Sequence, residues 1–189
     1  MRTALFALLL FSAEACAQSE APLPVLTAGF GGGWTFKFYP DADFSYVCPG
    51  GINFDAGLAW RVSDFFGVSL DAGSSAISSQ DGFVDGNGLR HEARLSLGSV
   101  WIAAGLCLRF AHFSIEPGAA FHMVRSEINA FGEQSHAEKL DPSYALRVSY
   151  YIALGERVSL TAGVAVHYLT DLQLCLILPR VGLDVALLY

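Results

Sequence analysis

The chain has 189 residues, enough for a single domain, and no linker rich in Pro, Gly or Ser divides it. Hydrophobic residues make up 53% of the chain and its mean hydropathy is +0.42, but no run of apolar residues after the N-terminal segment is long enough to form a membrane-spanning helix. The formal net charge of −7 and the lack of a basic stripe exclude a typical nucleic-acid-binding protein.

The N-terminal segment has the three parts of an export signal. Arg2 provides a basic n-region, residues 4–11 form a short apolar h-region, and residues 15–17 form a small-x-small cleavage site. We therefore predict a cleaved signal peptide at residues 1–17 and one mature domain at residues 18–189.

The rest of the chain alternates apolar with small or polar residues, which is the period of a β-strand. In the first such segment, Leu26, Phe30 and Trp34 alternate with Thr27 and Gly31. One uniformly apolar face on every strand, without helices to cover it, favours contact with lipid over a soluble β-sandwich. The predicted strands are residues 26–38, 52–62, 66–73, 93–110, 113–123, 144–154, 158–168 and 181–189.

The fourth of these segments does not keep one parity. Leu95 and Leu97 share one parity, whereas Val100 and Ile102 share the other. We interpret the change as a β-bulge near Gly98 and Ser99. Because a membrane-spanning strand needs only about 9–11 residues, we expect the first half of this strand to project beyond the bilayer.

The connections alternate in length. Long polar loops are predicted at residues 40–49, 77–90, 129–142 and 170–178, and tight turns near residues 64, 111 and 155. Long connections at one end, short ones at the other and an even strand count are typical of bacterial outer-membrane barrels. The predicted fold is an all-β, closed, antiparallel transmembrane β-barrel of about eight strands.

The closing segment, residues 180–189, resembles the last strand of bacterial outer-membrane proteins, with alternating Val185 and Leu187 and the aromatic Tyr189. With the export signal and strand count, the chain is similar to the small eight-stranded barrels of the OmpW-like and OmpA/OmpX-like families. The resemblance implies the outer membrane of a diderm bacterium, a lipid environment, loops at the cell surface, and recognition of the last strand by the barrel-assembly machinery.

The resemblance leaves two functions open. An OmpW-like barrel would give small or hydrophobic solutes a narrow route, whereas an adhesin-like barrel would bind host or matrix ligands with its outer loops and transport nothing. Neither hypothesis involves an enzyme, a cofactor or a metal.

Ionisable residues lie on the face predicted to point into the barrel. Charged groups at membrane depth are energetically costly and commonly mark function, but the interior of an eight-stranded barrel is only wide enough to be filled by side chains. We therefore expect a structural network of ion pairs, with a conducting or gating role as the alternative. The set is Lys37, Asp55, Arg61, Asp71, Glu116, Arg147, Arg180 and Asp184.

Three other motifs have simpler interpretations. His112, Ser114 and Glu116 resemble the nucleophile set of lipid A deacylases, but His112 lies at a predicted periplasmic turn, on the wrong side for outer-leaflet lipid. Residues 81–92 match part of a calcium loop but carry Phe at a ligand position and lack flanking helices. The glycines at 29–33 lack the helix and Lys of a phosphate-binding loop; we expect them to let the strands coil around a narrow lumen.

An odd number of cysteines follows the predicted cleavage site. Cys48 and Cys175 lie in the first and last outer loops, which neighbour each other in a closed barrel, so a disulfide between them is one hypothesis. Cys107 has the inward parity of a small filler residue. An alternative interpretation of the N-terminus makes Cys16 an acylated lipoprotein cysteine, although the residues before it fit that pattern poorly.

Overall fold

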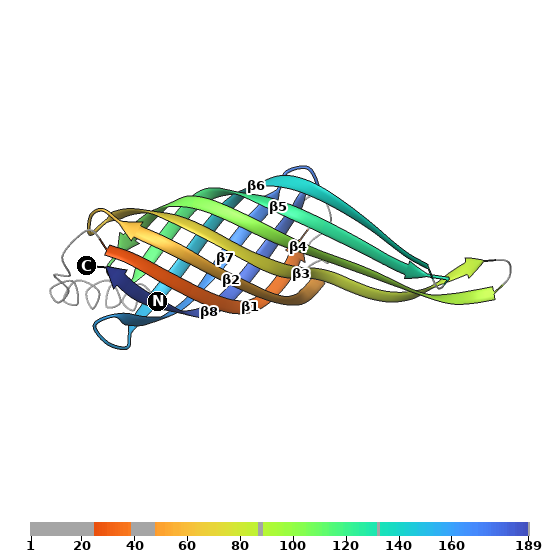
Figure 1. The fold of residues 1–189 in the computed structure, drawn as a ribbon, viewed down its shortest axis with the longest axis horizontal. Coiled ribbons are helices and arrows are strands. Elements are labelled where there is room, and N and C mark those ends of the chain that lie inside the picture. The colour runs from red at the N-terminus through yellow and green to blue at the C-terminus, as the bar shows by residue number, and fades with distance from the viewer. Residues whose placement is uncertain (1–24, 39–47, 87–88, 132, 189) are drawn as a thin grey trace, which may run out of the picture.

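The computed structural model describes residues 25–38, 48–86, 89–131 and 133–188, which form eight antiparallel strands. Each strand pairs with the next in the sequence, and β1 pairs with β8 to close the barrel (Figure 1), so the predicted fold is confirmed. No helix in these ranges is long and apolar enough to cross a bilayer. The proposed signal peptide lies outside the described residues. The strands are β1 (Val25–Phe38), β2 (Cys48–Arg61), β3 (Phe66–Gly86), β4 (Leu89–Phe110), β5 (Phe113–Ala130), β6 (Glu133–Ala153), β7 (Val158–Leu169) and β8 (Leu174–Leu188).

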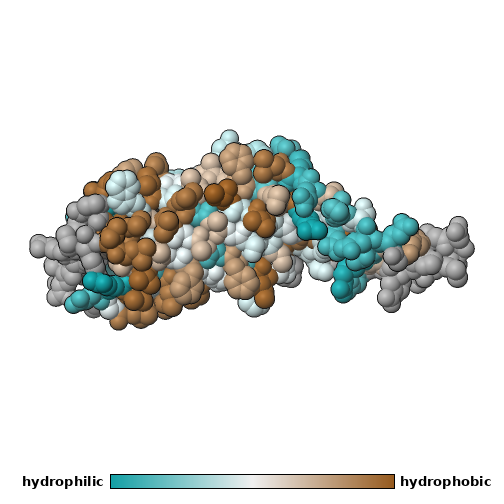
Figure 2. Space-filling model, in the orientation of Figure 1, coloured by the Kyte–Doolittle hydropathy of each residue, from teal (hydrophilic) through white to brown (hydrophobic). Residues whose placement is uncertain are grey.

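The apolar parity of the strands forms the outer surface of the barrel. Large side chains such as Phe54, Trp60 and Tyr144 are 61%, 49% and 70% exposed. Figure 2 shows the hydrophobic colour over the body of the barrel and the hydrophilic colour concentrated toward one end. A continuous apolar exterior of this kind suits hydrocarbon rather than water.

Short connections lie at the end of the barrel where β1 begins and β8 ends. They occupy residues 62–65, 111–112 and 154–157, which confirms the three predicted tight turns. Val62 and Ser63 both donate backbone hydrogen bonds to the Phe66 carbonyl, each at 3.1 Å. We call this the turn end of the barrel.

At the opposite end, β3, β4, β5 and β6 continue beyond the other strands (Figure 1). The predicted loops at 77–90 and 129–142 are wrong in this respect, since β3 and β4 pair as far as Gly86 and Leu89, and β5 and β6 as far as Ala130 and Glu133. The outward residues here are mostly polar or charged because they meet water, so the apolar outer face that marks a membrane strand ends. We call residues 78–86, 89–97, 125–130 and 133–142 the extension.

The last predicted loop, at 170–178, is also too long. The turn covers only residues 170–173, and β8 starts at Leu174. The Asp141 carboxylate holds this turn, because it accepts hydrogen bonds from the backbone N–H groups of Asp171 at 3.0 Å and Leu172 at 2.9 Å. Of the first predicted loop, residues 40–47 lie outside the described residues, and Cys48 already belongs to β2.

The predicted bulge lies on the neighbouring strand. The register between β4 and β5 runs without a shift past Gly98 and Ser99. The shift is in β3, between Ala76 and Ser78; Ile77, which lies within it, keeps the inward parity of Ser75 and is fully buried. The change of apolar parity along β4 therefore has another cause, which the interior makes clear.

Candidate functional site: the barrel interior

The interior of the barrel consists of two layers of different chemistry. Near the turn end it is lined by charged and hydroxyl side chains, which we call the charged layer. Toward the extension it is filled by aliphatic side chains, which we call the apolar plug. The charged layer comprises Asp55, Arg61, Asp71, Arg109, Glu116, Arg147, Tyr151, Arg180 and Asp184. The plug comprises Ile77, Val124, Ala165, Leu169, Leu174, Leu176 and Leu178.

Arg147 of β6 forms the centre of the charged layer. Its Nη1 lies 2.9 Å from Asp71 Oδ1 of β3 and 3.5 Å from Glu116 Oε2 of β5, and the three side chains are only 12%, 9% and 6% exposed. Glu116 is the direct register partner of Arg147, whereas Asp71 is reached across the lumen. The arginine thus ties non-adjacent strands together.

A second ion pair joins Arg180 of β8 to Asp55 of β2, with 2.9 Å between Arg180 Nη2 and Asp55 Oδ1. Asp184 accepts a hydrogen bond from the Thr161 hydroxyl instead of pairing with an arginine. A Cβ on Gly31 would lie 2.6 Å from Arg180 Nη2, so this glycine leaves the space that the guanidinium occupies.

Two residues of the proposed network are not brought into it. Lys37 lies at the other end of β1 and donates a hydrogen bond to Ser78 Oγ at 2.8 Å. Arg61 faces the charged layer but forms no ion pair with any described residue. The structure adds Arg109, whose guanidinium carbon lies 4.5 Å above the Tyr151 ring; its parity on β4, shared with Cys107, could have identified it.

His112, Ser114 and Glu116 do not assemble as a nucleophile set. Ser114 donates a hydrogen bond to Glu116 at 2.7 Å inside the barrel. His112 lies in the turn, 6.1 Å from the ring of Tyr150, which has the outward parity. The serine hydroxyl therefore has a carboxylate and the Tyr151 hydroxyl as its neighbours, not an imidazole.

A buried histidine pair lies between the charged layer and the plug. His122 Nε2 is 2.8 Å from His167 Nδ1, and His122 Nδ1 is 3.1 Å from Ser99 Oγ. Both rings are at most 2% exposed and pack against Trp101. This hydrogen-bond chain satisfies the polar atoms of a closed interior. The sequence analysis missed it, although both histidines have the inward parity.

The apolar plug was also missed, because inward positions were expected to be polar. Leu174, Leu176 and Leu178 have the same parity as Arg180 and are between 0% and 3% exposed. Ile77 from the bulge and Leu169 from β7 complete the packing, both at 0%. Among the described residues, these side chains therefore fill the lumen at this level.

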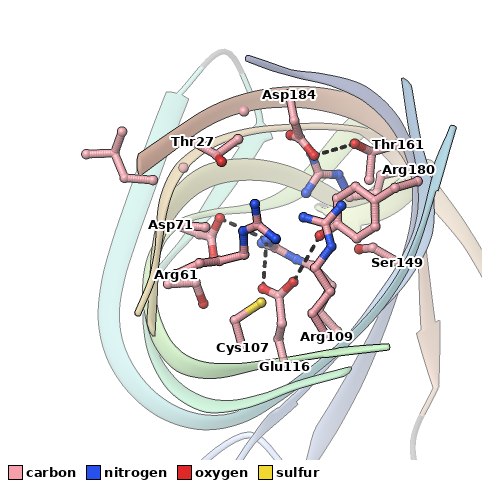
Figure 3. A pocket seen from close by; sticks show the side chains of 17 residues that line it. Thr27, Arg61, Asp71, Cys107, Arg109, Glu116, Ser149, Thr161, Arg180 and Asp184 are labelled. Atoms are coloured by element: carbon pink, nitrogen blue, oxygen red, sulfur yellow. Dashed lines mark hydrogen bonds and ion pairs between the residues drawn. The ribbon is translucent and has the colours of Figure 1, made fainter. Parts of the chain in front are cut away.

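The space left in the interior is small. One cavity of about 50 Å³ lies in the charged layer (Figure 3), and another measures about 20 Å³. Because a buried water needs about 10–15 Å³ on this scale, these cavities hold a few waters and no larger solute. A wider groove of about 420 Å³ lies on the outer surface at the base of the extension, between Val100, Met123 and Arg125.

The remaining site residues are placed as follows. Cys175 is a free thiol, so the hypothetical disulfide to Cys48 is not formed. Cys48 pairs with Lys37 and Cys175 with Phe38, so strand β1 lies between the two cysteines. The calcium-loop segment is part of the β3–β4 hairpin. Of the proposed assembly signal, Leu187 is 51% exposed on the outer face, and Tyr189 lies outside the described residues.

Comparisons with known proteins identify the fold. No protein-family model and no curated protein matches the chain. Among solved structures, a major outer membrane protein from Thermus thermophilus has a TM-score of 0.64 at 11% identity, covering 87% of this chain and 100% of that one. Ail, the attachment invasion locus protein of Yersinia pestis, has a TM-score of 0.59 at 11% identity, covering 87% and 99%. The chain therefore has the fold of the small eight-stranded outer-membrane β-barrels.

Proposed function

We propose that the chain is an integral outer-membrane protein that works as a surface interaction module. In this proposal the barrel is a closed anchor in the bilayer, and the extension is the part that binds a ligand outside the cell. This is the adhesin-like hypothesis of the sequence analysis. The observation that supports it best is the filled interior.

The filled interior disfavours the OmpW-like alternative. A narrow route for small or hydrophobic solutes needs a continuous passage or an apolar cavity, and such ligand pockets usually measure about 300–1,000 Å³. Here the cavity in the charged layer is about 50 Å³. Solutes moving toward the extension would meet Leu174, Leu176 and Leu178, all essentially unexposed.

The extension offers a surface suited to a macromolecular ligand. Four strands are paired side by side, but Glu133–Asp141 of β6 pair only with β5, because the pairing of β6 with β7 starts at Ser143. The outer backbone edge of β6 is thus open to a further strand. Leu95 and Ile128, on the face that continues the barrel interior, are 42% and 49% exposed.

The charge pattern narrows the class of ligand. One solved structure of Ail contains the heparin analogue sucrose octasulfate; that chain matches with a TM-score of 0.58 at 11% identity, covering 87% of this chain and 99% of that one. In the extension of this chain, Arg94 pairs with Asp81 at 2.6 Å, Arg125 with Glu138 at 3.9 Å, and Lys139 with Asp171 of the β7–β8 turn at 3.3 Å. Each Lys or Arg whose side chain is described there has an acidic partner, so we infer a protein ligand rather than a polysulfated glycan.

Two measurements test this proposal together. In planar bilayers the folded protein is expected to show no conductance above the protein-free bilayer. In a binding assay, cells that display the full chain are expected to adhere to at least one immobilised extracellular-matrix protein of a panel. The same cells are not expected to adhere to immobilised heparin. A shortened variant, in which Asn-Gly turns replace residues 80–95 and 128–135, is expected to fold but to bind none of the panel.

The outcomes separate the two hypotheses. Steady conductance or solute flux through the unmodified protein would contradict the closed-anchor proposal and favour the transport route. Equal retention of the matrix protein by the full and shortened chains would contradict a role for the extension. Heat-modifiable migration on gels provides the control that the shortened barrel is folded.

A further inference from the structure

The mouth of the charged layer contains two arginines, Arg61 and Arg109, that form no ion pair with a carboxylate of the described residues. Arg61 is the last residue of β2 and Arg109 the second-last residue of β4, so both lie at the turn end. Figure 3 shows the two side chains reaching into the same cavity, together with Arg180. This arrangement is independent of the extension and of the proposed surface function.

The carboxylates of the charged layer are engaged elsewhere. Asp71 and Glu116 both pair with Arg147, as described above. Asp55 pairs with Arg180, and Asp184 accepts the Thr161 hydroxyl. Asp64, in the adjoining turn, attracts Arg61 electrostatically but lies beyond ion-pair distance in the described structure.

Several donors around the cavity lack acceptors. Arg61 Nε and the Ser149 hydroxyl are buried and have no hydrogen-bond partner in the structure. The Arg109 guanidinium carbon lies 4.5 Å from the centre of the Tyr151 ring, and no side-chain hydrogen bond from Arg109 to a described residue is found. Buried polar groups are rarely left unpaired in folded proteins, so an acceptor for these donors is expected.

We propose that the cavity between Arg61 and Arg109 binds an oxyanion, a carboxylate or a phosphate group, that enters from the turn end. Guanidinium groups bind the oxygens of such anions through paired N–H donors, and this interaction is strong where solvent is limited. The cavity of about 50 Å³ admits one such group and not a bulky molecule. The anion is either a free ion or the headgroup of a lipid beside the barrel mouth.

Arginine side-chain NMR tests this site directly. The protein is folded in dodecyl maltoside micelles, which contain no phosphate, and titrated at constant ionic strength with inorganic phosphate, and separately with acetate. The Nε–H signals of Arg61 and Arg109 are expected to shift saturably with at least one of these ions, while the signal of Arg94 in the extension stays unchanged. A second titration uses mixed micelles of dodecyl maltoside and phosphatidylglycerol; a shift only there identifies a lipid headgroup, and a shift with the free ions identifies a soluble anion.

Substitutions then assign the binding to the two arginines. Arg61→Gln and Arg109→Gln are each expected to weaken anion binding at least about tenfold, the effect of losing roughly one charge-assisted hydrogen bond. Arg94→Gln, the matched control, is expected to bind like the unmodified chain. If a Gln variant does not fold, Arg61→Lys keeps the charge but removes the planar donor pair, and partial weakening is expected. The proposal is overturned if neither Nε–H signal shifts in any titration. It is also overturned if both Gln variants bind the anion as tightly as the unmodified chain. Where a Gln variant does not fold, unchanged binding by Arg61→Lys takes its place in this comparison.

Discussion

Arg147→Met is the substitution expected to damage this barrel most through its charged layer. Arg147 attracts Asp71 at 2.9 Å and Glu116 at 3.5 Å; at an effective dielectric constant of about 20, each attraction is roughly 5 kcal/mol before desolvation is subtracted. Removal of the arginine leaves two carboxylates close together in a closed interior, with exposures of 9% and 6%. From buried ion pairs in general, we expect a loss of about 3–5 kcal/mol in the free energy of unfolding.

The measurement is urea unfolding of the protein in lipid vesicles, followed by tryptophan fluorescence and by heat-modifiable migration. The triple variant Arg147→Met, Asp71→Leu, Glu116→Met removes all three charges together and is expected to regain most of the loss, since apolar replacement of a whole buried network is often neutral. Arg94→Met breaks the solvent-exposed pair with Asp81 and is expected to leave the unfolding midpoint unchanged. If Arg147→Met were as stable as the unmodified chain, the charged layer would not hold the barrel together.

Four further substitutions, one of them a control, test the packing and one turn. Gly33→Ala places a Cβ 1.8 Å from the Pro179 carbonyl oxygen across the β1–β8 seam and should abolish or strongly reduce refolding yield, whereas Gly98→Ala, with its nearest atom at 3.5 Å, should refold normally. Leu176→Ala empties part of the fully buried plug and should lower the unfolding free energy by about 2–5 kcal/mol; an unchanged urea midpoint would mean that the plug is loosely packed. Gln173→Gly relieves a positive φ of 49° in the β7–β8 turn and should raise the unfolding free energy by up to about 1 kcal/mol, and a lower midpoint would contradict this.

The membrane-facing part of the fold could be predicted because one physical rule governs it. Outward residues at bilayer depth are mostly apolar, so positions such as Phe54, Leu70 and Val181 show the period of two, although the outward Ser74 is polar. The strand count, closure and three tight turns follow from that pattern. The parity rule also placed Asp71, Arg147 and Arg180 inside, although their partners could not be derived, because pairing across the lumen depends on side-chain reach rather than on sequence distance.

The strands of the extension could not be predicted from the sequence. Their outer face meets water instead of lipid, so nothing requires the outward residues to be apolar. Residues 129–142 are polar enough to look like a loop, yet residues 129–130 end β5 and residues 133–142 begin β6. What holds these strands is pairing with each other, including the contact of Arg125 with Glu138 at 3.9 Å. Polar composition therefore indicated exposure to water correctly but did not distinguish a loop from an exposed sheet.

The parity change along β4 follows from where the strand meets its surroundings. Within the bilayer, the outward Val100 and Ile102 are apolar, and the inward Ser99 is polar. Beyond the apolar band the outward Arg94 is charged, while the inward Leu97 packs against the plug. The register between β4 and β5 is unbroken, so the backbone of β4 continues without a bulge in that pairing. What changes at this level is the type of residue: outward positions become polar and inward positions become apolar. β5 shows the same exchange, because its inward Val124 belongs to the plug and its outward Arg125 is charged. When the apolar parity inverts at the same level in two paired strands, the inversion thus marks the edge of the lipid-facing band. In β4 alone, the same inversion looks like a β-bulge.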